Sequence, residues 1–128
     1  MTAAPGKPAL WGGRIISGLV GAMLLMSAAM KFSGNPELLA GLAKIGLPVE
    51  KLTLIAALEI VSVVLYLLPH TAVLGAILLS GYLGGAIIAH LRIDEPGLVV
   101  VFIGVFAWLG LFLRDPRLRQ LLPLRSLG

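Results

Sequence analysis

The chain contains no cysteine among its 128 residues. This absence excludes disulfide bonds, thiolate metal ligands and dithiol redox chemistry. Charged residues are also scarce, at 12% of the chain, although Lys and Arg outnumber Asp and Glu by 10 to 6. No basic block is interleaved with exposed aromatic residues, so the positive charge does not indicate nucleic-acid binding. The two histidines have no acidic neighbours at metal-site spacing, which argues against structural zinc.

Hydrophobic residues, by contrast, make up 59% of the chain, and the mean hydropathy is +1.03. An average soluble domain is about half apolar and about a quarter charged. Apolar stretches occupy residues 11–30, 52–68, 72–91 and 98–113, and a transmembrane helix needs about 20 such residues. The stretches lack the alternation typical of strands. The sequence therefore predicts one all-α integral membrane domain over residues 1–128, built as a transmembrane four-helix bundle.

Residues 36–45, between the first two apolar stretches, have the pattern of a short amphipathic helix. Asn35 suits the N-cap position, and Pro36 and Glu37 suit the first helical turn. The apolar residues on one face of this helix are Leu38, Leu42 and Ile45. We predict that the helix lies in the membrane interface. An ordinary surface helix packed on the bundle is the alternative.

The distribution of Lys and Arg predicts the orientation in the membrane. We call the end of the bundle that carries both termini side A and the opposite end side B. Side A carries six basic residues and side B four: Lys7, Arg14, Arg114, Arg117, Arg119 and Arg125 against Lys31, Lys44, Lys51 and Arg92. Basic residues in short flanks favour the cytoplasm. We therefore expect a multi-pass protein of the bacterial inner membrane, with both termini cytoplasmic and side B facing the periplasm.

Glu59 is the single ionisable residue in the apolar stretch TLIAALEIVSVVLYLL. It lies about 10 Å from the side-B surface at a rise of 1.5 Å per residue. A charge near the centre of a membrane helix costs about 2.5–3.5 kcal/mol, so such residues face the protein interior and have partners. Lys31, His90 and Arg92 are the cations that the layout brings to the same half of the bundle. We expect Glu59 to face inward and to contact Lys31 or His90.

Other polar residues share helix faces with this group. Ser62 and Tyr66 follow Glu59 at helical spacing, and Tyr82 lies two turns before His90. The candidate ligand-binding residues are thus Glu59, His90, Lys31, Tyr66, Tyr82, Ser62 and Arg92. They fit a buried site for a ligand or a proton. They also fit a structural clamp between three helices, with Lys31 and Arg92 as interface anchors.

Small residues recur at intervals of four in the third apolar stretch, as in Gly81 and Gly85. Such spacing lets helix backbones approach closely. We expect these residues to pack within the bundle, although the pattern leaves a homodimer open.

The four apolar stretches, MKF after the first, ALEIV in the second and GYLGGAIIAHLR closing the third resemble the DoxX-like membrane proteins. The resemblance extends over roughly Arg14–Arg117 and rests on Lys31, Glu59 and His90 in particular. It implies a four-helix bundle of the bacterial inner membrane. Some relatives are subunits of a thiosulfate:quinone oxidoreductase, and distant eukaryotic ones are chaperones or cargo receptors. The similar core of vitamin K epoxide reductase depends on cysteines, which are missing here.

Two main functions remain open. In the first hypothesis, the chain binds a small amphipathic molecule such as a quinone or a lipid, alone or as the membrane subunit of a redox complex. Alternatively, it is a non-enzymatic chaperone or assembly factor for another membrane protein. A proton-coupled transporter is a third reading, but no inverted repeat supports it. Because no haem-ligand pair, cluster ligand or dinucleotide fingerprint is evident, we expect no intrinsic cofactor and no activity without a partner protein.

Overall fold

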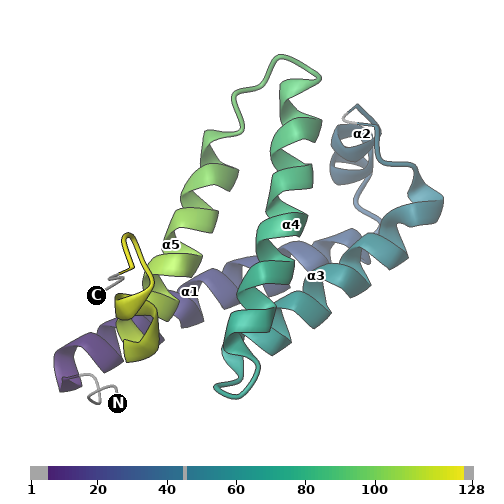
Figure 1. Cartoon of the computed structure of the whole chain (residues 1–128). Coiled ribbons are helices and arrows are strands. Elements are labelled where there is room, and N and C mark those ends of the chain that lie inside the picture. The colour runs from purple at the N-terminus through teal and green to yellow at the C-terminus, as the bar shows by residue number, and fades with distance from the viewer. Residues whose placement is uncertain (1–5, 45, 126–128) are drawn as a thin grey trace.

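The computed structural model describes residues 6–44 and 46–125 of the chain, and all regular structure in these ranges is helical. The five α-helices are joined by short connections, one of which contains a 3-10 segment, and a second 3-10 segment follows the last helix (Figure 1). In chain order the elements are α1 (Lys7–Lys31), α2 (Pro36–Lys44), η1 (Val49–Lys51), α3 (Leu52–Leu67), α4 (Ala72–Leu91), α5 (Leu98–Arg114) and η2 (Pro116–Gln120).

The four apolar stretches each form one helix, and the all-helical fold agrees with the sequence-based expectation. Only α1 and α4, of 25 and 20 residues, are long and apolar enough to cross a membrane by length and composition among the described residues. Helices α3 and α5 are equally apolar but shorter, at 16 and 17 residues.

The predicted helix at 36–45 is α2, and its N-terminus is capped as expected. The Asn35 side-chain oxygen accepts a hydrogen bond of 2.9 Å from the Glu37 backbone N–H, and Pro36 occupies the first helical position. These contacts satisfy donors that have no partner within the helix. Ile45 lies outside the described residues.

The long helices pack in a ring, in which α1 contacts α3 and α5, and α4 contacts the same two helices. Helix α2 packs only on the side-B end of α1 and has no buried residue. Figure 1 shows α2 beside the end of the bundle where α4 and α5 are joined.

The hydrophobic core lies in the side-A half. On α4 the buried residues end at Leu83, and on α5 they begin at Ala107. The buried hydrophobic cluster consists of Val20, Leu24, Val63, Tyr66, Ala72, Ala76, Leu79, Leu83, Ala107, Leu111 and Leu118. Helices α4 and α5 are thus closely packed only near the termini, whereas α1 and α3 keep buried residues toward side B, namely Ala28, Leu52 and Ala56.

Two glycines allow the helices to pack closely at the side-A end of the bundle. A Cβ at Gly75 would lie 2.0 Å from the Tyr66 backbone nitrogen, and one at Gly13 would lie 2.7 Å from the Gly110 carbonyl oxygen. Only glycine permits these approaches of α4 to α3 and of α1 to α5. By contrast, a Cβ at Gly81 or Gly85 would meet nothing within 4 Å. The prediction that the small residues of α4 close the bundle is therefore wrong for its side-B half.

Candidate functional site

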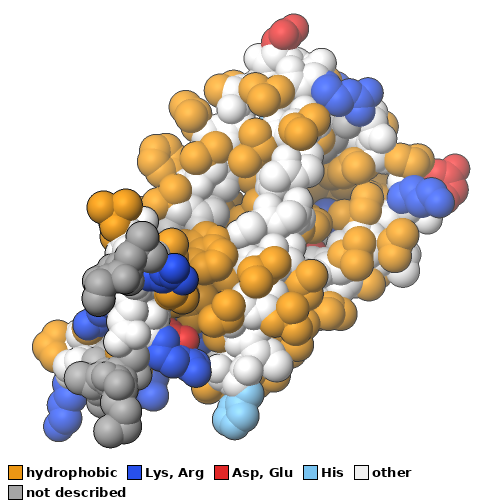
Figure 2. Space-filling view, viewed as in Figure 1, with side chains coloured by type: hydrophobic (Ala, Val, Ile, Leu, Met, Phe, Trp, Pro, Cys, Tyr) orange, Lys and Arg blue, Asp and Glu red, His pale blue; other side chains and the backbone are white. Residues whose placement is uncertain are grey.

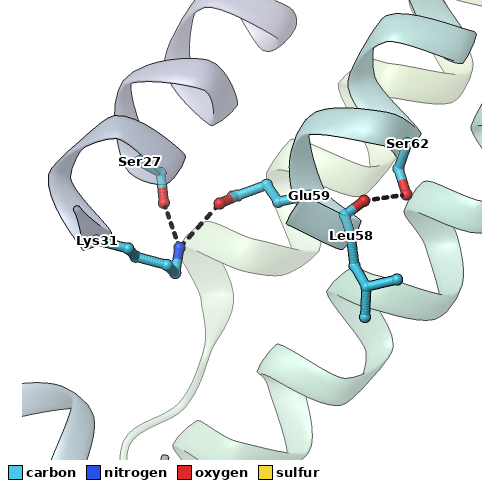
Figure 3. Close-up of polar contacts among 5 residues, drawn as sticks. All are labelled: Ser27, Lys31, Leu58, Glu59 and Ser62. Atoms are coloured by element: carbon cyan, nitrogen blue, oxygen red, sulfur yellow. Dashed lines mark hydrogen bonds and ion pairs between the residues drawn. The ribbon is translucent and has the colours of Figure 1, made fainter. Parts of the chain in front are cut away.

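Glu59 forms a buried ion pair with Lys31, as predicted (Figure 3). The Lys31 ammonium donates a hydrogen bond of 2.9 Å to Glu59 Oε1 and another of 3.0 Å to the Ser27 hydroxyl. The side chain of Glu59 is 1% exposed and that of Lys31 is 7% exposed. Ser27 lies one turn before Lys31 on α1, so α1 supplies the cation and its second partner while α3 supplies the carboxylate.

A cavity of about 750 Å³ lies next to this pair, and both Glu59 and Lys31 line it. The cavity occupies the space left where α4 and α5 pack less closely toward side B. Its walls come from all five α-helices and are largely apolar, with Met23, Leu24, Ile55, Leu83, Val100 and Ile103 among them. In Figure 2 the surface is hollowed between α4 and α2, with acidic and basic side chains visible in the depth of the hollow.

Tyr82 and His90 line the same cavity from α4. Tyr82 and Glu59 thus share the wall of one cavity, from α4 and α3 respectively. The His90 Nδ1 atom lies 2.7 Å from the Ala86 carbonyl oxygen, so the ring proton resides on Nδ1. His90 Nε2 is 4.0 Å from the Glu95 carboxylate at the mouth of the cavity. These two residues of the predicted site therefore belong with Glu59 and Lys31.

Tyr66, another residue of the predicted site, lies elsewhere. It is fully buried on α3 toward side A, and it does not line the cavity. Its hydroxyl donates a hydrogen bond of 2.5 Å to the Ala107 carbonyl oxygen and lies 3.1 Å from the Ser17 hydroxyl. The Arg114 guanidinium stacks 4.8 Å from the centre of its ring. Tyr66 therefore joins α1, α3 and α5 instead of contacting a ligand in the cavity.

Ser62 and Arg92 are also outside the cavity. The Ser62 hydroxyl donates a hydrogen bond of 2.7 Å to the Leu58 carbonyl of its own helix (Figure 3). Arg92 is exposed after the end of α4, beside Gly46. The Ser62 hydroxyl thus already donates to a carbonyl of its own helix. Arg92 lies at the surface because it follows the last turn of α4.

Sequence reasoning missed two parts of the site. Ser27 is one turn from Lys31, and this spacing was a usable signal. The apolar residues of α2 line the cavity through Leu38 and Leu42, and Leu47 follows them. The amphipathic pattern predicted an apolar face on α2, but it did not show that this face would lie over a cavity.

The site places hydrogen-bond donors and acceptors beside a largely apolar cavity. Two of the three Lys31 N–H groups have partners, and one oxygen of Glu59 accepts from Lys31. Lys31, Glu59 and Tyr82 all line the cavity, and their remaining polar atoms are the groups that a ligand there would meet. Since Lys31 and Glu59 neutralise each other, the arrangement suits a polar but uncharged group attached to an apolar body.

Comparison with known proteins gives one match. A model of the DoxX-like family matches residues 15–112. This range runs from the third turn of α1 to near the end of α5, so it contains every residue that lines the cavity. No curated protein and no solved structure matches the chain.

Proposed function

The chain belongs to the DoxX-like family, and on the geometry of its side-B half we propose that it binds a small amphipathic molecule, such as a quinone or a lipid, in the cavity beside Lys31 and Glu59. The observation that carries the proposal is that both members of the buried ion pair line a cavity of about 750 Å³.

The cavity distinguishes a binding site from a structural clamp. Protein interiors are close-packed, with few voids larger than a water molecule. A clamp needs only the two charges in a packed interior, whereas here the charges border an apolar space. Its volume falls within the range of about 300–1,000 Å³ that is typical of small-molecule sites.

The polar groups indicate how such a molecule would be held. A carbonyl oxygen would accept a hydrogen bond from Lys31 or Tyr82, and a hydroxyl would donate one to Glu59. A quinone offers the first group, a quinol the second, and a glycerolipid both. The apolar body would lie against Leu24, Leu83 and the apolar face of α2.

The membrane placement is part of the proposal. Family membership and the two long apolar helices indicate a membrane protein. We infer that α3 and α5 also cross the bilayer, since they pack against α1 and α4 along the same bundle. With the excess of basic residues on side A, both termini are cytoplasmic in a bacterial inner membrane and α2 lies in the outer interface.

A redox role would require a partner protein. With no cysteine in the sequence, any electrons would come from another subunit. The alternative, a chaperone or assembly factor, is favoured by one observation. A Cβ at Gly81, which is exposed on α4 and does not line the cavity, would meet nothing within 4 Å, so a further helix from a client or a second copy could approach there.

The test is to purify the protein in mild detergent and to measure co-purified quinones and lipids by mass spectrometry, per mole of protein. Glu59→Gln keeps the shape of the side chain and removes its charge. Hydrogen bonds to charged groups contribute about 1.5–3 kcal/mol, so retention should fall roughly ten- to a hundredfold. Glu50→Gln, which removes the same charge from an exposed position on side B, is the matched control.

A second variant tests the cavity without changing any charge. Ala86 lines the cavity on α4, and Ala86→Phe places a ring in the apolar space. It should reduce retention as strongly as Glu59→Gln does. Retention that is equal in the parent and in both variants would locate the bound molecule elsewhere. A parent that retains no quinone or lipid would favour the clamp.

A further inference from the structure

The C-terminal segment 115–125 is fixed against the side-A end of the bundle. Leu118 of η2 is buried in the hydrophobic core. Arg119 donates a hydrogen bond of 3.1 Å to the Leu113 carbonyl oxygen, and its guanidinium lies 5.8 Å from the centre of the Phe112 ring. The segment therefore stays beside the last turn of α5 and does not extend away from the bundle.

Leucines of this segment are exposed beside its basic residues. Leu121 is 51% exposed and Leu124 is 85% exposed. An open pocket of about 520 Å³ is lined by Arg119, Gln120, Leu121, Leu124 and Arg125. Basic groups next to apolar side chains, at the end of a membrane helix, have the composition of a segment that lies among lipid headgroups.

The two ends of the molecule differ strongly in charge. Six basic residues and one acidic residue on side A give a net charge of +5, whereas four basic and five acidic residues give −1 on side B, which sums to the +4 of the chain. In Figure 2 basic side chains gather around the start of α1 and the C-terminal segment, while acidic and basic ones are mixed at the opposite end.

The one acidic residue of side A is already paired. Arg117 Nε lies 3.2 Å from Asp115 Oδ1. Burial alone would raise the pKa of Asp115, but hydrogen bonds from Arg117 outweigh this effect, and the pKa is lowered. Asp115 and Arg117 therefore neutralise each other at neutral pH, and no other carboxylate side chain of side A is available to Arg119 and Arg125.

We propose that the pocket of the C-terminal segment is a binding site for an anionic phospholipid of the side-A leaflet. The phosphate would accept hydrogen bonds from the guanidinium groups of Arg119 and Arg125, and its acyl chains would cover Leu121 and Leu124. Guanidinium groups present paired donors that match phosphate oxygens. This proposal requires the side-A end to lie at a membrane surface, but it does not depend on any ligand of the Glu59 cavity.

The test compares thermal unfolding of the full chain in neutral detergent with added phosphatidylglycerol or phosphatidylcholine. Phosphatidylglycerol should raise the melting temperature more than phosphatidylcholine does. Its apparent affinity should fall about fivefold for each of Arg119→Gln and Arg125→Gln, since a basic residue near an anionic surface contributes about that factor. Arg119→Lys with Arg125→Lys keeps the charge and should retain most of the response. Lys51→Gln, on side B, is the control.

Equal responses of the parent to both lipids would overturn the proposal, as would an equal loss in Lys51→Gln. Inorganic phosphate is added in a separate titration. If it reproduces the effect of phosphatidylglycerol, the pocket binds free anions and the lipid assignment is wrong. Because a lipid is also a candidate ligand of the Glu59 cavity, the loss of the phosphatidylglycerol response in Arg119→Gln and Arg125→Gln is what assigns it to the side-A pocket, and an undiminished response in both variants would overturn the proposal.

Discussion

Gly75 is the point where α3 and α4 approach most closely, and Gly75→Ala should destabilise the bundle strongly. A Cβ there would lie 2.0 Å from the Tyr66 nitrogen, 2.4 Å from the Tyr66 Cα and 2.5 Å from the Leu65 carbonyl carbon. All three are backbone atoms, so no side-chain rotation relieves the overlap. Because real Cβ atoms are essentially never found within 3.0 Å of such atoms, the two helices would have to move apart.

This separation would act on the contacts around Tyr66. The Tyr66 carbonyl accepts a hydrogen bond from Arg114, and its hydroxyl bonds to Ala107 on α5. Overpacking of a well-packed core costs about 1–3 kcal/mol, occasionally more. The gain in helix propensity from Gly to Ala is about 1 kcal/mol and offsets part of this. Because the overlap is with backbone atoms, we place the cost at the upper end of this range, which leaves a net loss of about 2 kcal/mol, or about 8 °C in melting temperature for a chain of this size.

Gly81→Ala is the matched control, because it makes the same chemical change on the same helix. A Cβ at Gly81 meets nothing within 4 Å. Only the gain in helix propensity then remains, and the melting temperature should stay equal or rise. Thermal unfolding in detergent, followed by circular dichroism, measures both variants. If Gly75→Ala melts at or above the parent, the close approach of α3 and α4 is wrong.

Three further outcomes are expected. Lys31→Met should lower the free energy of unfolding by about 3–5 kcal/mol, because it leaves Glu59 buried without its cation. Urea or thermal unfolding measures this loss. The double variant Lys31→Met with Glu59→Leu should recover much of it. Tyr66→Phe should cost about 0.5–1.5 kcal/mol, because it removes the hydrogen bond to the Ala107 carbonyl, which keeps its own partner within α5; the same unfolding assay measures this, and ligand retention should not change. A cysteine at Lys44 would be the single thiol of the chain, and it should react with an impermeant maleimide from the periplasm; labelling only after permeabilisation would reverse the orientation.

The helical elements were predictable because the apolar composition decides them. The stretches 52–68, 72–91 and 98–113 correspond to α3, α4 and α5 within one residue at each end, whereas α1 begins four residues before the predicted stretch. The Glu59–Lys31 contact was also predictable, since a buried carboxylate needs a partner and few cations lay at its depth. In both cases a strong local constraint leaves few alternatives.

The division of the polar residues between cavity and core was not predictable. Glu59, Ser62 and Tyr66 share a face of α3, and helical spacing treats them alike. What separates them is where α4 diverges from α3, and that depends on Gly75, whose closeness to Tyr66 appears only in three dimensions. Gly81 and Gly85 have the same composition as the packed glycines and yet border open space. Small-residue spacing permits a close approach but does not require one.

The ion pair also bears on how the proposed site could exchange a ligand. A single charge bordering an apolar cavity would carry a large desolvation cost whenever no ligand offset it. Lys31 and Glu59 satisfy each other, and Ser27 accepts a further Lys31 hydrogen bond, without any contribution from a ligand. A molecule with an uncharged polar group can then enter or leave without exposing an unpaired charge. The site therefore favours reversible binding of neutral amphipathic molecules over retention of a charged one, and an extract dominated by a strongly anionic lipid bound beside Glu59 would contradict this.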